Sequence, residues 1–210
     1  MLRYIYAEDL KRYPALDETM FSHRAAQFRD RLGWDVAVDG KGHERDGYDA
    51  MNPLYAVWER ADGSHGGSMR FLPTVAETMV NDHFAHLAGA EIRHPLIWEC
   101  TRFCLAPDAQ PRTAALLMLA ALEVGLRFHL TDLVGVFDAR MVRVYRRLGW
   151  EPTVLGRDGA GRESISVGLW TCTENVRPVL LDRAGVTAAQ ADGWFDASFG
   201  AIRPGLSATG

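Results

Sequence analysis

Residues 96–137 read LIWECTRFCLAPDAQPRTAALLMLAALEVGLRFHLTDLVGVF, and this stretch determines the fold. Residues 96–105 alternate between apolar and polar side chains, which predicts a central β-strand. Residues 112–130 are rich in alanine and leucine, so we expect a helix that is buried over most of its surface. Residues 133–137 are apolar, which predicts a second, compact and buried strand. A strand, a buried helix and another strand in this order indicate an α/β core.

The sequence on either side of this core predicts a mixed sheet with helices on both faces. Pro14 interrupts a helical pattern over residues 9–32, so we expect a break or a helix start there. In the helix expected at residues 74–87, Thr74 is the predicted N-cap and Glu77 completes a capping box. Further strands are expected at residues 2–6, 54–60, 67–72, 152–156 and 163–170, further helices at residues 139–148 and within about 172–200, and a frayed tail after about residue 203.

The second half of the chain resembles the core of the GCN5-related N-acetyltransferase fold. In that fold two neighbouring central strands splay apart, and the pantetheine arm of the acyl carrier lies in the gap. The resemblance implies an α/β fold with a twisted mixed sheet, helices on both faces and an acyl cleft between the splayed strands. A chain of 210 residues is long enough to bury a substantial core, and we expect residues 1–210 to form one domain.

The composition narrows the class of protein. Hydrophobic residues make up 48% of the chain and charged residues 24%, which argues against extensive disorder. The net charge of −4 argues against nucleic-acid binding, and no apolar run approaches the roughly 20 residues that span a bilayer. The N-terminus does not resemble a secretory signal. Three cysteines, Cys100, Cys104 and Cys172, have no C-x-x-C spacing, so we expect neither disulfides nor a metal site, and a cytoplasmic location.

The most specific pattern lies in the first quarter of the chain. It reads Arg24-x3-Phe28-x2-Arg31-x2-Trp34-x-Val36, and after a polar, glycine-rich stretch it ends in E-x-D-x-Y-D at residues 44–49. This pattern resembles the signature of acyl-homoserine-lactone synthases, the autoinducer synthases of bacterial quorum sensing. His23 departs from the family, which usually has a bulky apolar residue at that position. The resemblance continues in residues 70–74 (RFLPT), Phe84 and residues 98–103 (WECTRF), and it fades after about Trp170.

The resemblance implies a reaction and a set of substrates. The enzyme would transfer an acyl group from acyl carrier protein or acyl-CoA to the amine of S-adenosylmethionine, then close a lactone and release methylthioadenosine. Both reactants are substrates, so no cofactor is expected. The residues that the resemblance places around S-adenosylmethionine are Arg24, Phe28, Trp34, Asp46, Asp49, Arg70 and Phe84, with Glu99 and Arg102 at the catalytic centre.

The chemistry of these side chains suits S-adenosylmethionine. Phe28 and Trp34 offer aromatic faces to the sulfonium cation and the adenine ring. Asp46 and Asp49 can hold the substrate ammonium group through charge-assisted hydrogen bonds, and Arg24 can anchor the loop by pairing with a carboxylate. Glu44 is a further candidate partner, for Arg70 or for Arg102.

The amine must lose a proton before it attacks the thioester. Glu99 is our candidate general base, acting through water, and burial beside the acyl gap is expected to raise its pKa. Asp46 is the alternative base. Backbone N–H groups around Phe103 are candidates for stabilising the oxyanion. The second step, closure of the lactone, is intramolecular, so positioning alone can suffice.

The sequence is less specific about the residues that bind the acyl donor. The loop at residues 107–111 is expected to point N–H groups at a pantetheine phosphate. Side chains expected to line the acyl pocket are Thr101, Phe103, Leu116, Leu119, Val136, Tyr145 and Ile165. Candidates for docking the donor are Arg112 and a helical stripe of Arg140, Arg143 and Arg147, which can equally be a solvated face. Asp138 stands where family members favouring 3-oxo chains tend to carry threonine or serine, which suggests an unsubstituted chain and a coenzyme A donor.

Two other readings stay open at this stage. A GCN5-like N-acyltransferase acting on another amine would not need the pattern at residues 24–49. A non-catalytic module that binds S-adenosylmethionine or an acyl carrier would not need intact acidic residues. The sequence does not determine the length or substitution of the acyl chain.

Overall fold

The computed structural model describes residues 1–161 and 164–200. Its seven-stranded sheet has the order β1-β2-β3-β4-β5-β7-β6. The strands are β1 (Leu2–Tyr6), β2 (Leu54–Glu59), β3 (His65–Pro73), β4 (Ile97–Leu105), β5 (Asp132–Asp138), β6 (Thr153–Asp158) and β7 (Ile165–Thr171). The helices are α1 (Pro14–Ala25), α2 (Met79–Ala88), α3 (Thr113–Arg127), α4 (Ala139–Leu148), α5 (Arg177–Ala184) and α6 (Ala188–Phe199), with the short segments η1 (Ala7–Arg12), η2 (Ala26–Arg31), η3 (Gly47–Met51) and η5 (Glu174–Val176).

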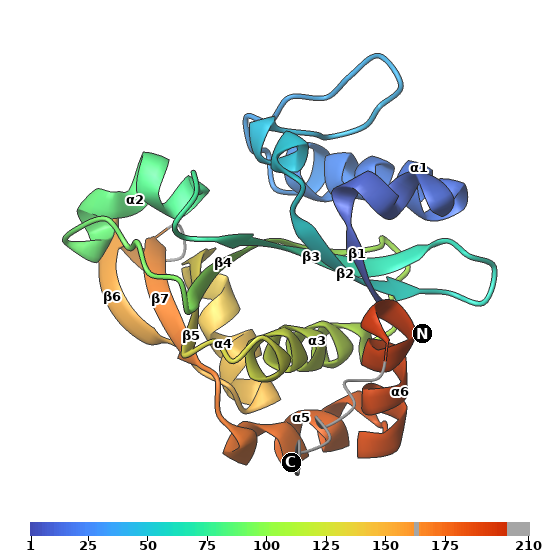
Figure 1. Ribbon diagram of the computed structural model, residues 1–210. Helices are drawn as coiled ribbons and strands as arrows, with labels where there is room; N and C mark the ends of the chain where they lie inside the picture. The colour runs from blue at the N-terminus through green and yellow to red at the C-terminus, as the bar shows by residue number, and fades with distance from the viewer. Residues whose placement is uncertain (162–163, 201–210) are drawn as a thin grey trace, which may run out of the picture.

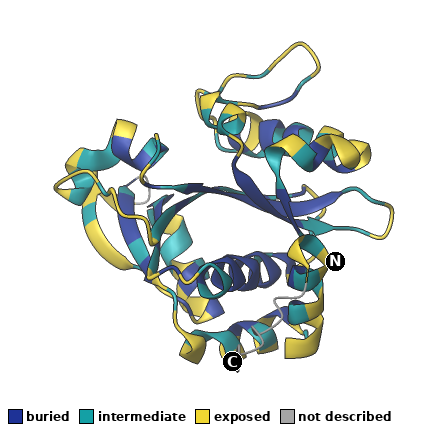
Figure 2. Cartoon of the chain, viewed as in Figure 1, coloured by how far each residue is buried: buried dark blue, intermediate teal, exposed yellow. Residues whose placement is uncertain are grey.

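The helices cover both faces of the sheet, as predicted. In Figure 1, α1 and α2 lie above the sheet, and α3, α5 and α6 lie below it. Helix α3 lies between the sheet and α5, and it is buried along nearly all of its length, as Figure 2 shows. The helix is apolar on all sides because the sheet buries one side of it and α5 buries another.

The sheet opens at one place, between β4 and β5. These two strands are parallel and pair only from Ile97 opposite Asp132 to Glu99 opposite Val134. Every other pairing in the sheet is antiparallel. Beyond Glu99 the two strands diverge, so the splay that the fold resemblance implied is present.

A β-bulge lies in β4 at the point where it leaves β5. The register with β3 passes from Arg70 opposite Thr101 to Ser68 opposite Cys104, so Arg102 and Phe103 together face one residue of β3. Arg102 has a φ of 53°, in the left-handed region. This conformation costs a non-glycine residue about 1–2 kcal/mol, so contacts elsewhere must hold it.

Two predictions about the helices have different outcomes. The break at Pro14 is confirmed, because α1 begins at this proline, and the π-helical segment η2 continues the helix. The capping box at Thr74 and Glu77 is wrong, because α2 begins only at Met79. The buried Thr74 instead donates its hydroxyl to the carbonyl oxygen of Ile97 at 2.8 Å and accepts from the amide of His94 at 3.1 Å.

The remaining elements agree with the sequence, apart from their ends. Residues 35–53 form no long element, only an isolated bridge between Val38 and Glu44 and the short segment η3. The expected tail after residue 203 and the expected start of a strand at Glu163 lie outside the described residues. Across residues 1–161 and 164–200 no helix has the length and apolar character needed to cross a membrane.

Candidate active site

A cavity of about 820 Å³ passes through the sheet where β4 and β5 diverge. Above the sheet it is lined by side chains of η2, of the loop that follows and of α2; below the sheet it is lined by α3 and α4. The lining on the upper side includes Phe28, Trp34, Asp46, Tyr48 and Phe84, and on the lower side Met118, Ala121, Met141, Val144 and Tyr145. The cavity therefore joins a polar aromatic chamber to an apolar one.

Two aromatic rings form a wall of the upper chamber. Phe28 lies in η2, and its ring is stacked on Trp34 with centroids 5.2 Å apart and planes 13° from parallel. The π-helical turn of η2 and the residues after it place both rings on the same side of the chain. Trp34 is 41% exposed, so one face of this stack is available to a ligand. Such a surface suits a flat ring or a cation.

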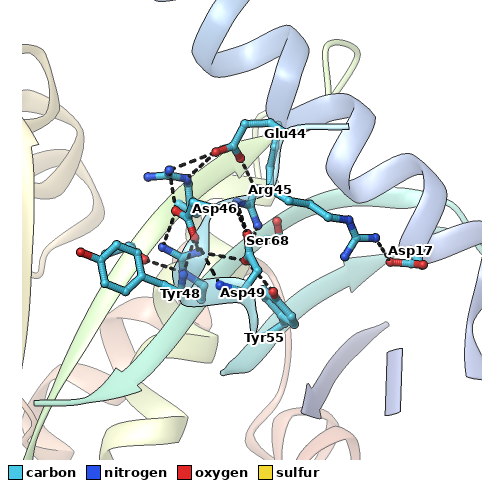
Figure 3. A network of polar contacts seen from close by, with 12 residues as sticks. Asp17, Glu44, Arg45, Asp46, Tyr48, Asp49, Tyr55 and Ser68 are labelled. Atoms are coloured by element: carbon cyan, nitrogen blue, oxygen red, sulfur yellow. Dashed lines mark hydrogen bonds and ion pairs between the residues drawn. The ribbon is translucent and has the colours of Figure 1, made fainter. Parts of the chain in front are cut away.

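Beside this wall, three arginines and three carboxylates form a closed network. Figure 3 shows the carboxylates of Glu44, Asp46 and Asp49 in dashed contact with guanidinium groups. Arg24, from α1, donates to Asp49 through both terminal nitrogens at 2.9 Å, and its Nε donates to Glu44 at 2.5 Å. All three nitrogens of its guanidinium thus donate to two carboxylates. The prediction that Arg24 anchors the loop agrees with this geometry.

The other two arginines come from the central strands. Arg70 of β3 binds Asp46 and Asp49, and its Nε donates to the hydroxyl of Thr101 at 3.1 Å. Arg102, in the bulge of β4, donates to Glu44 at 3.0 Å and to Asp46 at 2.7 Å. Glu44 is therefore the partner of Arg102 and of Arg24, and not of Arg70. The network joins residues that lie 20 to 58 positions apart in the sequence.

The loop that carries these carboxylates is held by its own capping. Asp46 is the N-cap of η3 and accepts from the amides of Tyr48 and Asp49, while Asp49 accepts from the amide of Asp46 at 2.8 Å. The two aspartates of E-x-D-x-Y-D thus form a capping box, and their carboxylates also pair with the arginines of the network. Tyr48 reaches α2 and donates to Asp82 at 2.7 Å.

The acidic residues differ in exposure, and therefore in what they can do. Asp49 is nearly buried; burial would raise its pKa, but the hydrogen bonds and charge of Arg24, with Arg70 and Tyr55, lower the pKa overall. The Asp46 side chain keeps 20% of its surface exposed and lines the cavity. Of the two aspartates expected to hold the substrate ammonium group, only Asp46 faces the cavity, and Asp49 holds the arginines.

Glu99 is buried where β4 and β5 begin to diverge, as expected, but it does not line the cavity. It is 1% exposed, and its two carboxylate oxygens accept from the amides of Met79 at 3.2 Å and Val80 at 2.6 Å. A residue of β4 therefore caps the N-terminus of α2, where the sequence had suggested Thr74. Burial raises the pKa of Glu99 to about 7, although the amide of Val80 and the charge of Arg70 oppose this shift.

The lower chamber corrects part of the predicted acyl pocket. Thr101, Phe103, Val136, Tyr145 and Ile165 line the cavity as expected. Leu116 and Leu119 do not; both are completely buried in the core on the other faces of α3. The cavity-facing side of α3 consists of Ala114, Met118 and Ala121 instead. Because α3 is apolar on all sides, its periodicity did not show which face meets the cavity.

Sequence reasoning missed an aromatic cluster in the lower chamber. Phe137, Tyr145 and Trp170 pack edge to face, with ring centroids 4.9–5.5 Å apart. All three line the cavity, as do Trp150, Cys100, Met79 and His83. The three rings come from β5, α4 and β7, so no local spacing in the sequence would have grouped them.

The predicted donor-docking arginines do not share one surface. Arg140 lines the large cavity and pairs with Asp138, the N-cap of α4, while Arg143 and Arg147 are exposed on α4. Arg112 lies instead at a separate cavity of about 760 Å³, together with the loop expected to bind phosphate, and packs over Trp58. Arg112 is therefore not part of the α4 stripe.

The sheet, the splay and the continuous cavity define a fold of the GCN5-related N-acetyltransferase class. A putative N-acetyltransferase from Lactobacillus plantarum superposes with a TM-score of 0.55 over 82% of this chain and 99% of that chain, at 15% identity. A CoA-dependent acyl-homoserine lactone synthase, BjaI, solved with SAM and isopentyl-CoA, superposes with a TM-score of 0.81 over 90% of both chains, at 23% identity. The predicted fold class is confirmed.

Sequence comparison defines the family. The model of the autoinducer synthases matches residues 8–178. An acyl-homoserine-lactone synthase of Rhizobium etli is 42% identical over 181 residues, which are 82% of this chain and 85% of that protein. A second one, of Agrobacterium fabrum, is 32% identical over 165 residues, covering 71% and 78% of the two chains. The chain belongs to the autoinducer synthase family, and it is an acyltransferase.

Proposed function

We propose that the protein transfers an acyl group from a thioester to the amine of S-adenosylmethionine and then closes an acyl-homoserine lactone, releasing methylthioadenosine. The observation that carries this proposal is the cavity through the sheet, which joins a charged aromatic chamber to an apolar one. An amine bound above the splay and an acyl chain bound below it would meet between β4 and β5. The family membership supports the same reaction.

In the upper chamber, the stack of Phe28 and Trp34 receives the adenine ring and the sulfonium group. Asp46 accepts from the ammonium group, because it is the carboxylate of the network that faces the cavity. Arg102 also lines the cavity, next to Asp46, and is our candidate to meet the substrate carboxylate; Arg31 is a second cation in the lining. Arg24, Arg70 and Asp49 are buried beneath this layer and fix its geometry.

The first bond to form is the amide. Glu99 removes a proton from the ammonium group, acting through water, and a pKa of about 7 suits this transfer at neutral pH. Each of its carboxylate oxygens accepts one amide hydrogen bond and keeps a second lone pair for that water. The neutral amine attacks the thioester carbonyl, the tetrahedral intermediate breaks its carbon–sulfur bond, and the expelled thiolate takes up the second proton that the nitrogen loses on becoming an amide. Asp46 is the alternative base.

The second bond to form is the ester of the lactone. The carboxylate of the substrate attacks its own γ-carbon, the carbon–sulfur bond breaks, and neutral methylthioadenosine leaves with the bonding electron pair. The sulfonium is consumed, so charge is balanced without a further proton donor. Because the step is intramolecular, holding the carboxylate near the γ-carbon is the main requirement on the protein.

The donor is acyl-CoA or acyl carrier protein, and the exposed arginines of α4 are positioned to meet an anionic carrier. Arg140 lies at the cavity, and Arg143 and Arg147 continue along the exposed side of α4. An acidic carrier protein or the phosphates of coenzyme A would be attracted to such a stripe. Acyl-CoA, acyl carrier protein and S-adenosylmethionine are all found in the cytoplasm, so we propose that the enzyme acts there.

The test is to incubate the purified chain with S-adenosylmethionine and a panel of acyl donors, on coenzyme A and on acyl carrier protein, and to measure methylthioadenosine and lactone by mass spectrometry. Both products are expected with at least one donor. Absence of both with every donor would contradict the proposal. To test the stripe, Arg143→Glu should raise KM for the donor, whereas Arg183→Glu, a matched charge reversal on the exposed side of α5, should not.

A further inference from the structure

We propose that the acyl pocket selects a chain that carries an oxygen substituent near the thioester, and that the hydroxyl of Tyr145 recognises this oxygen. The inference rests on the proposed function, because it assigns the lower chamber to the acyl group. It names a specificity-determining residue and a substrate class: acyl donors with a hydroxyl or carbonyl on one of the first carbons of the chain.

The position of Tyr145 is fixed by its neighbours. Its ring lies on α4 and packs edge to face against Phe137, at 5.5 Å and 90°, and against Trp170, at 4.9 Å and 77°. The residue is 7% exposed and lines the cavity. A tyrosine held on two sides by aromatic rings has little freedom to turn its hydroxyl elsewhere, so the polar atom is presented at a defined place in the pocket.

The hydroxyl of Tyr145 has no hydrogen-bond partner among residues 1–161 and 164–200. The hydroxyl is not sealed in the core either, since the buried side-chain atoms that lack a partner in the described residues belong to Tyr4, His43, Thr78 and Trp170. It therefore opens on the cavity that Tyr145 lines. A ligand oxygen in this apolar chamber that accepts from Tyr145 would gain a hydrogen bond that the protein itself does not use.

Other polar groups around this chamber have partners within the protein. The hydroxyl of Thr101 accepts from Arg70 at 3.1 Å and lies on the strand at the splay, and the indole N–H of Trp150 donates to the carbonyl oxygen of Thr171 at 3.1 Å. Asp138 caps α4 through the amide of Arg140 at 2.8 Å. Capping accounts for an aspartate at this position, so its identity need not indicate an unsubstituted chain.

The place of the hydroxyl indicates which part of the acyl chain it meets. Tyr145 packs on Trp170 at 4.9 Å, and the ring of Trp170 and the carbonyl oxygen of Cys100 both lie against Gly135 of β5. Cys100 follows Glu99, the last residue of β4 that pairs with β5, and it precedes Thr101 and the bulge. This region is the splay, where the amine and the thioester meet in the proposed reaction. The oxygen that Tyr145 contacts therefore belongs to the start of the chain, as in 3-hydroxyacyl and 3-oxoacyl thioesters.

The experiment compares kcat/KM for unsubstituted, 3-hydroxy and 3-oxo donors of one chain length, each on coenzyme A and on acyl carrier protein. We expect the unaltered enzyme to prefer one of the oxygenated donors by roughly 10-fold, the effect of a single neutral hydrogen bond with its desolvated partner. Tyr145→Phe removes only the hydroxyl and should reduce this preference to within about twofold, because kcat/KM for the oxygenated donors falls relative to that for the unsubstituted donor.

Tyr4→Phe is the matched control. Tyr4 is likewise buried, and its hydroxyl also lacks a partner, but it does not line the cavity, so the donor preference should stay unchanged. An equal or better rate with the unsubstituted donor in the unaltered enzyme would overturn the inference, whether or not Tyr145→Phe folds. An unchanged preference in a folded Tyr145→Phe variant would overturn it as well. Absence of product with every donor would instead contradict the proposed function.

Discussion

Replacing Glu99 by glutamine tests both its burial and its role in proton transfer. The pKa of Glu99 in the folded chain is about 7, above its ordinary value of 4.5, mainly because of burial. The folded state therefore binds this proton more tightly than the unfolded state does. The resulting stabilisation is fully present below pH 4.5 and is lost as the pH rises through 7. The difference between these pKa values corresponds to roughly 3 kcal/mol.

Glutamine stays neutral at every pH. The Glu99→Gln variant should therefore be less stable than the unaltered protein at low pH and more stable at high pH. Near pH 5 the variant loses one of the two hydrogen bonds that cap α2, because an amide has only one acceptor oxygen, and it should be less stable by about 1 kcal/mol. Near pH 8 the unaltered protein carries a buried charge, and the variant should be the more stable by about 2 kcal/mol.

Urea unfolding of both proteins at pH 5, 6, 7 and 8 measures this difference, and the other titrating groups cancel because they are common to both. Glu77→Gln is the control, since Glu77 is exposed just before α2, and its effect should not vary with pH. A constant stability difference between Glu99→Gln and the unaltered protein would refute the reasoning. In the activity assay, kcat/KM of the unaltered enzyme should rise as the pH passes about 7 and fall at least about 100-fold in Glu99→Gln.

Three further substitutions test the rest of the site. Arg24→Met removes one of the two guanidinium groups that Glu44 and Asp49 each contact and leaves buried negative charge uncompensated, so the free energy of unfolding in urea should fall by about 3–5 kcal/mol; a loss below about 1 kcal/mol would show the network to be unimportant for stability. Trp34→Ala should raise KM for S-adenosylmethionine about 10-fold and leave KM for the acyl donor unchanged in steady-state assays. Ala121→Phe fills the lower chamber and should reduce kcat/KM for long acyl donors at least about 10-fold more than for short ones; equal losses would place the acyl chain elsewhere.

The fold was predictable from sequence where local pattern decides it. The alternation of residues 96–105 and the apolar run of residues 112–130 predicted β4 and α3 correctly. The start of α2 was not predictable, because Thr74 and Glu77 form a plausible capping box by spacing. The cap that the helix uses, Glu99, lies about 20 positions away and becomes adjacent only in the folded sheet.

The candidate site was likewise predictable in one part and not in the other. The acceptor residues could be named because the pattern at residues 24–49 resembles a family signature, whereas the capping box that shapes residues 46–49 became evident only in the structure. The acyl pocket could be named only in part, because α3 is apolar on every side. Its packing against β3 and α5 turns Met118 to the cavity and buries Leu116 and Leu119, and neither contact leaves a signal in the helix itself.

The bulge at Arg102 connects the two halves of the enzyme. Successive residues of a regular strand point to opposite faces, yet Thr101, Arg102 and Phe103 all line the cavity. The left-handed backbone of Arg102 makes this arrangement possible, at a cost of about 1–2 kcal/mol. Its guanidinium is held by Glu44 and Asp46, which offset that cost. Besides the amine binding that we propose for Asp46, Glu44 and Asp46 therefore hold β4 in the shape that opens the cleft beside β5.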